Sequence, residues 1–219
     1  SNNRVFRTEI FYKEYNNLYK TSAGPTGREA AASNNGFGYA RGFEVFWRDK
    51  KSIKNLDYWI SYSFLDTKRD FLNYPTEFQP AFAATHTASL VMKKFVLPWK
   101  TGFNASYSFA SGRPYYNLKF DNGTGKYLIA DQGKTINYNS LGFSLNYLPN
   151  LGKTNSKTFI VWVLSVTNVL GQKQVFSYNY STLSDRKEAV TPASKRFVYV
   201  GCFISFGIDR TQDAINNNL

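Results

Sequence analysis

A two-residue alternation runs through residues 102–109, which read Gly-Phe-Asn-Ala-Ser-Tyr-Ser-Phe. The odd positions are apolar, and the even positions carry only Gly, Asn or Ser. A second copy of the pattern follows at 140–147. Side chains on a β-strand point alternately to opposite faces, so each stretch predicts a strand with one apolar face and one small, polar face. A polar face without Lys or Glu is typical of a lumen row, and this pattern favours a transmembrane β-barrel.

The composition is compatible with this interpretation. Aromatic residues make up 18% of the chain, as expected where rings lie at membrane interfaces. The mean hydropathy of −0.41 does not exclude a barrel, because only alternate residues of each strand must be apolar. No apolar run approaches the roughly 18 residues that a membrane helix needs. A single cysteine, Cys202, excludes an internal disulfide framework.

Eight alternating segments predict an all-β chain, an up-and-down antiparallel barrel with strands over residues 1–208. The seventh extends past Gly171, where we expect a bulge, to about residue 180. Long connections at 16–37, 68–84, 110–137 and 181–195 alternate with short ones at 49–56, 96–101 and 149–156. The segments cover about 4–15, 38–48, 57–67, 85–95, 102–109, 140–147, 157–180 and 196–208.

This alternation of loop lengths predicts a location and an orientation. Barrels of the Gram-negative outer membrane have long extracellular loops and short periplasmic turns, and eight strands fit that phase throughout. A soluble β-sandwich has no reason to place every long connection at one end. We therefore expect a multi-pass outer-membrane protein in contact with lipid, with residues 209–219 as a periplasmic tail. The start of the chain, Ser-Asn-Asn-Arg-Val-Phe, indicates either a removed signal peptide or a piece of a longer protein.

The formal charge of +12 raises the possibility of nucleic-acid binding. The basic residues cluster at 48–54, 93–100 and 153–157, which are short connections between apolar segments. None of these clusters forms a stripe with interleaved stacking aromatics. Solvated turns, anionic lipid headgroups or an anionic substrate are the better interpretations, and we expect no nucleic-acid partner.

No catalytic or metal-binding constellation is visible. His86 lacks a second histidine and is expected in a loop or at a strand end, and Cys202 stands in the apolar row of the last segment. The Gly-rich segment 121–126 departs from the phosphate-loop spacing because position 120 is Phe, and it predicts a surface loop. We therefore expect no enzyme, no cofactor and no metal site.

Several segments resemble the C-terminal barrel of TonB-dependent outer-membrane receptors, in the branch that often carries a carboxypeptidase-regulatory-like N-terminal domain. The longest runs from GFEVFWRDKKSIKNLDYWISYSFLDTKRDF at 42–71 to Tyr74-Pro75. YSFASGRPY at 107–115, VTNVLG at 166–171 and RFVYVG at 196–201 follow in the order of the family. The resemblance implies a 22-stranded barrel, plugged by an N-terminal domain, that imports scarce nutrients with energy passed on by TonB.

With eight segments and no plug or TonB box, the chain corresponds to the last third of such a receptor. It would need the plug and the remaining strands, from the rest of the receptor or from a partner chain, and would reach TonB only through that plug. The alternative is a stand-alone eight-stranded barrel that acts as an anchor or adhesin without transport. The small residues of the polar rows favour the wider receptor lumen, whereas Phe11, Trp59 and Phe203 favour a filled small barrel. Unpaired strand edges are costly in lipid, so the first and last strands must find partners.

The receptor interpretation predicts ligand contacts in the long loops and the upper lumen, for a small molecule, glycan or peptide. Arg69 in one loop and Arg113, Tyr115 and Tyr116 in another combine guanidinium groups with rings that can stack on or hydrogen-bond a polar ligand. Packing of the loops is the alternative role for the same residues. Barrels of this family commonly carry an aromatic assembly signal in the last strand, and Phe206 is the best match.

Overall fold

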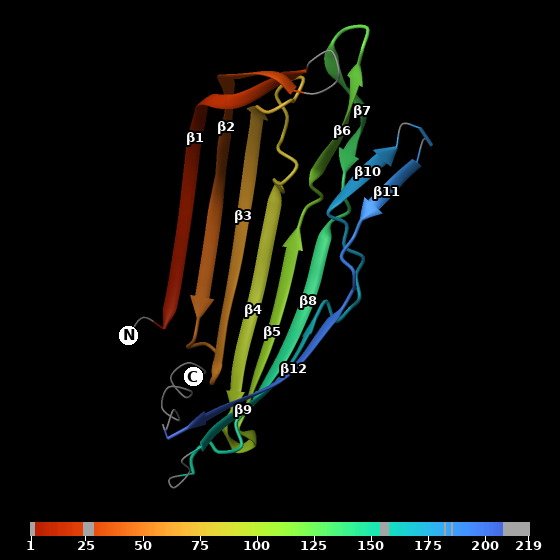
Figure 1. The fold of residues 1–219 in the computed structure, drawn as a ribbon. Helices are drawn as coiled ribbons and strands as arrows, with labels where there is room; N and C mark the ends of the chain where they lie inside the picture. The colour runs from red at the N-terminus through yellow and green to blue at the C-terminus, as the bar shows by residue number, and fades with distance from the viewer. Residues whose placement is uncertain (1–2, 24–28, 154–157, 182, 185, 208–219) are drawn as a thin grey trace.

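The structure is a computed structural model, and it describes residues 3–23, 29–153, 158–181, 183–184 and 186–207. Eight long strands form one antiparallel sheet, and two short hairpins project from one end (Figure 1). The residues expected to form a periplasmic tail, 209–219, lie outside the described residues. The elements are β1 (Arg4–Ala23), β2 (Glu29–Asp49), β3 (Leu56–Asp70), β4 (His86–Val96), the 3-10 helix η1 (Leu97–Trp99), β5 (Thr101–Ala110), β6 (Pro114–Asp121), β7 (Lys126–Lys134), β8 (Tyr138–Tyr147), β9 (Thr158–Thr167), β10 (Ser177–Ser181), β11 (Arg186–Val190) and β12 (Phe197–Phe206).

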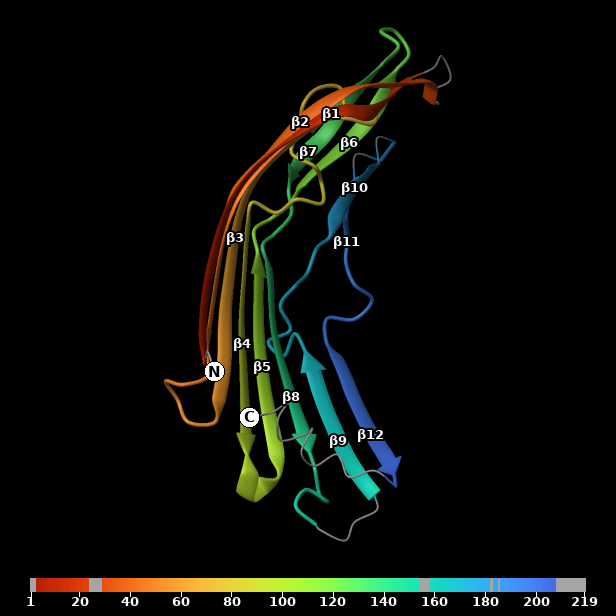
Figure 2. The same ribbon diagram turned by 90° about the vertical axis from the view of Figure 1, so that its left-hand side faces the viewer.

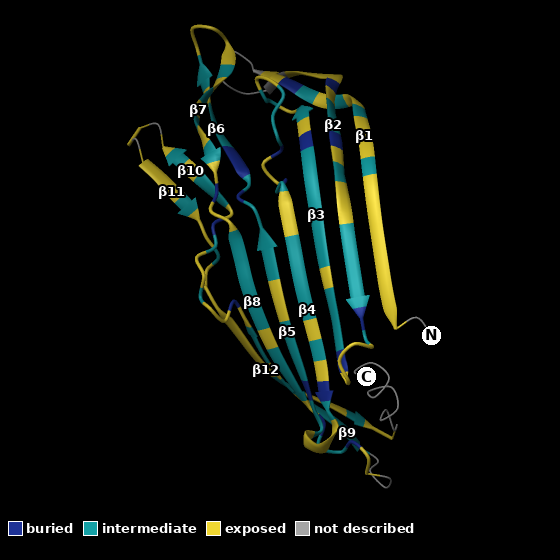
Figure 3. Cartoon of the chain, turned by 180° about the vertical axis from the view of Figure 1, so that it is seen from behind, coloured by how far each residue is buried: buried dark blue, intermediate teal, exposed yellow. Residues whose placement is uncertain are grey.

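The large sheet has the order β1-β2-β3-β4-β5-β8-β9-β12 and is open. Each strand pairs with the next one in the meander, as the eight alternating segments predicted. Among the described residues, β1 pairs with β2 and, near its end, forms an isolated bridge between Lys20 and Leu72, whereas β12 pairs only with β9. Figure 3 shows β1 exposed along most of its length, and Ile10 in β1 is 84% exposed. The sheet curls, with β9 and β12 turned away from β1–β3, without bringing its two edges together (Figure 2).

The strand register places the two kinds of residue on opposite faces. One cross-strand row contains Phe6, Trp47, Ile60, Leu90, Tyr107 and Leu141, and the adjacent row contains Arg7, Phe46, Ser61, Ser89, Ser108 and Ser140. We call the first the apolar face and the second the polar face. On the polar face, the hydroxyls of Ser61 and Ser89 lie 2.7 Å apart, and Asn104 donates to Ser144 at 3.2 Å. The alternation read from the sequence is therefore confirmed in the central strands, whereas Phe46, Val163 and Phe203 also stand on the polar face.

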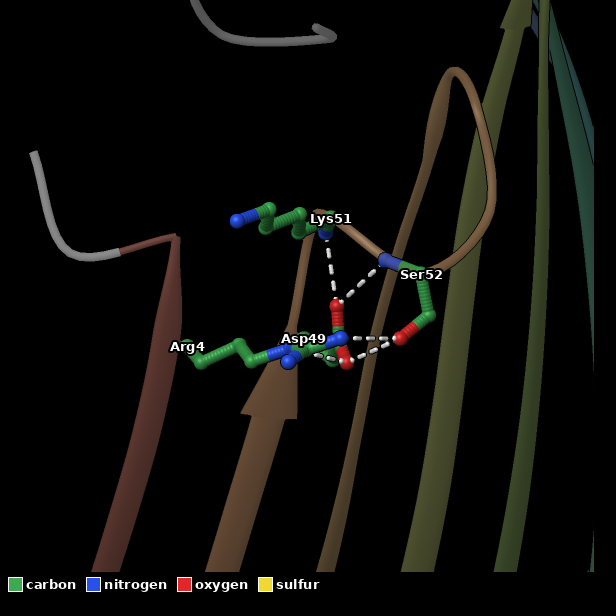
Figure 4. A network of polar contacts seen from close by, with 4 residues as sticks. All are labelled: Arg4, Asp49, Lys51 and Ser52. Atoms are coloured by element: carbon green, nitrogen blue, oxygen red, sulfur yellow. Dashed lines mark hydrogen bonds and ion pairs between the residues drawn. The ribbon is translucent and has the colours of Figure 1, made fainter.

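The short connections gather at one end of the sheet (Figure 1), and a buried carboxylate organises one of them. Asp49, at the end of β2, is 2% exposed. Its Oδ1 accepts from the backbone amides of Lys51 (2.6 Å) and Ser52 (2.9 Å), and its Oδ2 accepts from the Ser52 hydroxyl (2.7 Å). Arg4 of β1 completes the network with an Nε contact of 2.9 Å to Oδ2 (Figure 4). One side chain thus fixes the β2–β3 turn and ties it to the first strand.

A small apolar core lies at the same end. Phe95, Leu148 and Leu151 are buried there, with Phe159 and Val161 packed against them. The β4–β5 connection is tight: Lys100 follows η1 with a φ of 51°, and the Lys100 amide donates to the Leu97 carbonyl at 3.0 Å. This end of the sheet is closed by short turns and packed side chains.

The long connections gather at the opposite end, where they contain more strand than the sequence predicted. β1 and β2 continue through most of 16–37 as a bent hairpin, with register shifts after Tyr15 and a φ of 58° at Asn17 (Figure 1). Such irregularities increase the local bend of a strand. Residues 110–137 contain the β6–β7 hairpin, and 181–195 contain β11. Local pairing therefore extends three of the four predicted loops into hairpins.

The seventh predicted strand is the clearest departure. β9 ends at Thr167, and there is no strand across Gly171 to carry a bulge. Asn168 and Gly171 both adopt a positive φ, of 49° and 63°. The Asn168 side chain donates to the carbonyls of Gln172 (2.8 Å) and Lys195 (2.7 Å) and accepts from the Gln172 amide (3.1 Å). Asparagine tolerates the left-handed region and bonds its own backbone, so Asn168 turns the chain where apolar composition alone suggested that the strand continues.

Candidate functional site

A cavity of about 590 Å³ opens on the polar face below the long connections. This volume lies within the usual range for small-molecule sites. The sheet contributes Ser63, Thr87, Ala110 and Tyr138, and the connections contribute Phe82, Arg113, Ile136, Val175 and Phe176, among others. The cavity therefore has a small, partly polar floor and an apolar cover, with one guanidinium group at its wall.

Arg113 is the predicted site residue that lines this cavity. Its backbone amide donates to the Thr135 hydroxyl at 3.0 Å, and its carbonyl accepts from the Thr135 amide at 2.9 Å. Its Nη2 donates to the Phe176 carbonyl at 3.1 Å. No carboxylate of the described residues forms an ion pair with Arg113. A guanidinium carries five N–H donors, so Arg113 keeps donor capacity for an acceptor in the cavity.

Arg69 lies beside the cavity and is held by aromatic rings. Its guanidinium carbon lies 4.2 Å from the centre of the Tyr15 ring and 5.5 Å from that of Phe82, which lines the cavity. Its Nε is buried and has no hydrogen-bond partner among the described residues. Backbone hydrogen bonds to Phe78 fix the strand at this point. The arrangement is a cation–π sandwich, which limits how freely the guanidinium can turn.

The structure places the two predicted tyrosines in packing contacts between connections. Tyr115 is 4% exposed, its ring centre lies 5.0 Å from that of Tyr178, and Lys187 both covers its ring and donates to its hydroxyl. Lys187 also lies 3.5 Å from Asp131, so this cluster joins the β6–β7 and β10–β11 hairpins. Neither Tyr115 nor Tyr116 lines the cavity.

Tyr116 belongs to an aromatic cluster with residues of the β3–β4 connection. It stacks on Phe78 with ring centres 4.6 Å apart and meets Tyr74 edge-on at 5.7 Å. Burial raises the pKa of both tyrosine hydroxyls above the ordinary value. Both rings are therefore neutral near pH 7, and the cluster attaches the β6–β7 hairpin to the neighbouring loop.

The sequence did not single out the apolar residues that cover the cavity, Phe82, Ile136, Val175 and Phe176. Phe82 and Ile136 lie in connections without strand periodicity, and Val175 and Phe176 lie in the segment that the sequence predicted as the end of the seventh strand. Three of the four connections supply them, so tertiary arrangement was needed to bring them together.

The other residues that could have served catalysis or metal binding form hydrogen bonds within the fold. His86 begins β4, at a strand end as expected, and its Nδ1 lies 2.8 Å from the Tyr62 hydroxyl. In the β6–β7 turn, the Asp121 carboxylate accepts from the Thr124 hydroxyl (2.6 Å) and from the amides of Gly123 and Thr124, which lowers the pKa of Asp121. Within the described part of the chain, no group of three metal-binding side chains occurs. The helices there include none that is long and apolar enough to cross a membrane.

The last strand carries the other two residues of interest on its exposed apolar side. Cys202 is exposed and pairs in register with Trp162. Phe206 ends β12 opposite Thr158 and is 75% exposed. Its role as an assembly signal stays a prediction.

No protein-family model matches the chain, and no curated protein matches it in sequence. Solved structures match it in fold. The outer membrane transporter YddB from Escherichia coli aligns with a TM-score of 0.66 at 14% identity, over 93% of this chain and 30% of the transporter. The ferric yersiniabactin uptake receptor FyuA from Yersinia pestis gives 0.62 at 13%, over 94% and 28%. The ferric-catecholate import receptor Fiu from E. coli gives 0.57 at 13%, over 93% and 25%.

At these identities the likeness shows the fold: an antiparallel sheet like part of the wall of an outer-membrane receptor or transporter. The chain spans less than a third of the length of each of these three proteins.

Proposed function

We propose that this chain is the C-terminal part of the barrel of a TonB-dependent outer-membrane receptor that binds and imports a nutrient. In this proposal the chain forms the last third of a 22-stranded barrel. The remaining strands and the plug come from the rest of the receptor or from a partner chain, and TonB acts through that plug. The carboxypeptidase-regulatory-like N-terminal domain belongs to the same proposal, on the strength of the sequence resemblance.

The single observation that carries the proposal is the pair of free strand edges. Along residues 4–18 of β1 and along β12, the outward edge has no partner strand among the described residues. In a bilayer, each unsatisfied backbone group costs several kcal/mol, so an open sheet cannot stay as it is. A stand-alone eight-stranded barrel would need β1 and β12 to pair with each other, which the described strands do not do. Additional strands of the same barrel satisfy both edges.

The two faces of the sheet support the membrane part of the proposal. The apolar face carries exposed side chains over the full width of the sheet, including Phe43, Ile60, Phe143 and Val200. Such a face suits lipid, and the opposite face of Ser, Asn and Gly suits a hydrated or plugged lumen. The short connections would then face the periplasm and the long ones the exterior.

The cavity supports the ligand-binding part. It lies on the lumen side of this sheet, next to the long connections, where a receptor must receive its ligand. Within it, Arg113 supplies hydrogen-bond donors, and Arg69 lies behind Phe82. We propose these two arginines as ligand contacts, and Tyr115 and Tyr116 as residues of the same loop surface whose effect on binding passes through loop packing.

The proposal is tested by the native size of the protein in its own outer membrane. An antibody raised against the β6–β7 hairpin should detect, in mild detergent, a species roughly three to four times the length of this chain, as the covered share of the similar receptors implies. A folded species of 25.0 kDa that contains no other polypeptide would contradict it.

Import is tested separately, by growth. A strain lacking the gene should fail on one limiting nutrient from a panel of a ferric siderophore, cobalamin, a glycan and a peptide. The gene should restore growth, and Arg113→Ala should restore it at least about tenfold less efficiently at limiting nutrient, as for a lost charge-assisted contact. Lys173→Ala, outside the cavity lining, is the matched control. Equal restoration by Arg113→Ala and by the parent gene would remove Arg113 from the binding site.

A further inference from the structure

The short-connection end of the sheet is strongly basic. Its described acidic residues are Asp49 and Asp57, and both are already occupied by ion pairs: Asp49 with Arg4, and Asp57 with Arg48 and Lys50. The lysines around them that form no ion pair with a carboxylate of the described residues are Lys51, Lys54, Lys93, Lys94, Lys100 and Lys153. The end therefore carries a net positive charge that the sheet itself does not neutralise.

One of these cations, Lys94, stands on the apolar face. The register places it between Leu56 of β3 and Phe103 of β5, in a row that continues through Leu145 and Leu164. Lys94 is exposed, and no carboxylate of the described residues pairs with it. Its neighbour in the chain, Lys93, points to the opposite face, where its amino group lies 5.2 Å from the Trp59 ring. A lone ammonium group in an apolar row is costly unless an anion or water meets it.

The surroundings of Lys94 have the character of a membrane interface. Trp99, in η1, is 65% exposed and packs edge-on against Phe103, with ring centres 5.9 Å apart. Leu97 is 55% exposed beside it. In the adjacent strands, Tyr147 and Trp162 pair in register and are 45% and 49% exposed. Aromatic rings of this kind lie at the level of the lipid headgroups.

We propose that Lys94, with Trp99 and Phe103 beside it, forms a site for the phosphate of an anionic phospholipid in the leaflet at the short-connection end. The butyl stem of Lys94 lies along the apolar face, and its ammonium group reaches the headgroup phosphate. The rings of Trp99 and Phe103 pack against the upper acyl chains and the glycerol region. The basic turns around the site raise the local concentration of anionic lipid.

This inference rests on the proposed placement in a membrane, and the following experiment separates the two. The complete polypeptide that carries this chain is purified from outer membranes with the photo-crosslinking amino acid p-benzoylphenylalanine in place of Leu97. It is inserted into nanodiscs of equal parts phosphatidylglycerol and phosphatidylcholine and irradiated, and the attached lipids are identified by mass spectrometry.

The site predicts about fivefold more crosslinking to phosphatidylglycerol than to phosphatidylcholine, the ratio expected from one favourable lysine contact near an anionic lipid. Lys94→Gln should lower the ratio to the small excess that the basic turns give, and Lys94→Arg should keep the parent ratio. Lys126→Gln, an exposed lysine at the far end of the sheet, is the matched control and should leave it unchanged. Equal yields for the two lipids in the parent protein would overturn the lipid site and leave the membrane placement intact. The absence of crosslinks to either lipid would overturn both.

Discussion

The antiparallel strands are connected differently at the two ends of the sheet. At the short-connection end, the buried side chain of Asp49 accepts several hydrogen bonds and fixes a turn. An apolar cluster around Phe95 is buried at the same end. At the long-connection end, hairpins and loops are held by separate side-chain contacts, and a cavity remains open between them. One end therefore fixes the strand register, and the other leaves room on the polar face.

The largest difference should appear when one ring is removed at each end. Phe95→Ala empties a buried position and should lower the free energy of unfolding by about 3–5 kcal/mol. Phe120→Ala, in the β6–β7 hairpin, removes a ring whose aromatic contact is Tyr127 at 5.6 Å and should cost about 1 kcal/mol or less. Urea unfolding in lipid vesicles measures both. Similar losses at the two positions would abolish the distinction between a packed and an open end.

A smaller effect is expected at the point where the last pair of strands gives way to the long connection. Asn168→Ala removes three hydrogen bonds from a residue that is 2% exposed, and should cost about 1–3 kcal/mol while leaving backbone groups unpaired. Limited proteolysis should then cut within 168–195 faster than in the parent protein. Asn179→Ala, in β10 of the same connection, serves as the control. Unchanged protease resistance would show that Asn168 does not organise this connection.

The smallest effect concerns pH. The pKa of Asp121 is lowered by its bond from Thr124, so this contact stabilises the β6–β7 turn at pH values above the ordinary carboxyl value of 3.8. The contribution is lost as the pH falls through the lowered pKa in the folded protein. Amide exchange at Gly123 and Thr124 should accelerate there, and Asp121→Asn should remove the pH dependence. Exchange that is insensitive to pH across this range, apart from its intrinsic rate, would contradict the role of the carboxylate.

The regular strands could be predicted from the sequence, and the arrangement of the long connections could not. The period-two rows of 102–109 and 140–147 specify faces, and the register reproduces them because a shift of one residue would turn every side chain to the wrong side. The lengths of the connections predicted a short-turn end and a long-loop end, and the assignment of these ends to the periplasm and the exterior stays a prediction. The two-residue alternation and the lengths of the connections can both be read directly from the sequence, so neither depends on knowing the tertiary contacts.

The candidate site depended on contacts that no local pattern encodes. Arg113 was identified through its residue type, and it does line the cavity, whereas Tyr115 and Tyr116 pack against Lys187 and Phe78 from other connections. The continuation of the seventh strand failed at Asn168 because its side-chain bonds to the backbone outweigh the apolar composition of the segment. When loops pack against each other, the conformation of one loop cannot be predicted from its own sequence alone.

We propose that β1 and β12 are edges that pair with strands outside this chain. Double electron–electron resonance between spin labels at Ile10→Cys and Val200→Cys, with Cys202→Ser to remove the native thiol, measures their separation in the outer membrane. We expect a distance of several strand spacings, each about 5 Å, if further strands lie between the two edges. A distance of a single strand spacing, as between directly paired neighbours, would show a closed eight-stranded barrel and contradict the proposal.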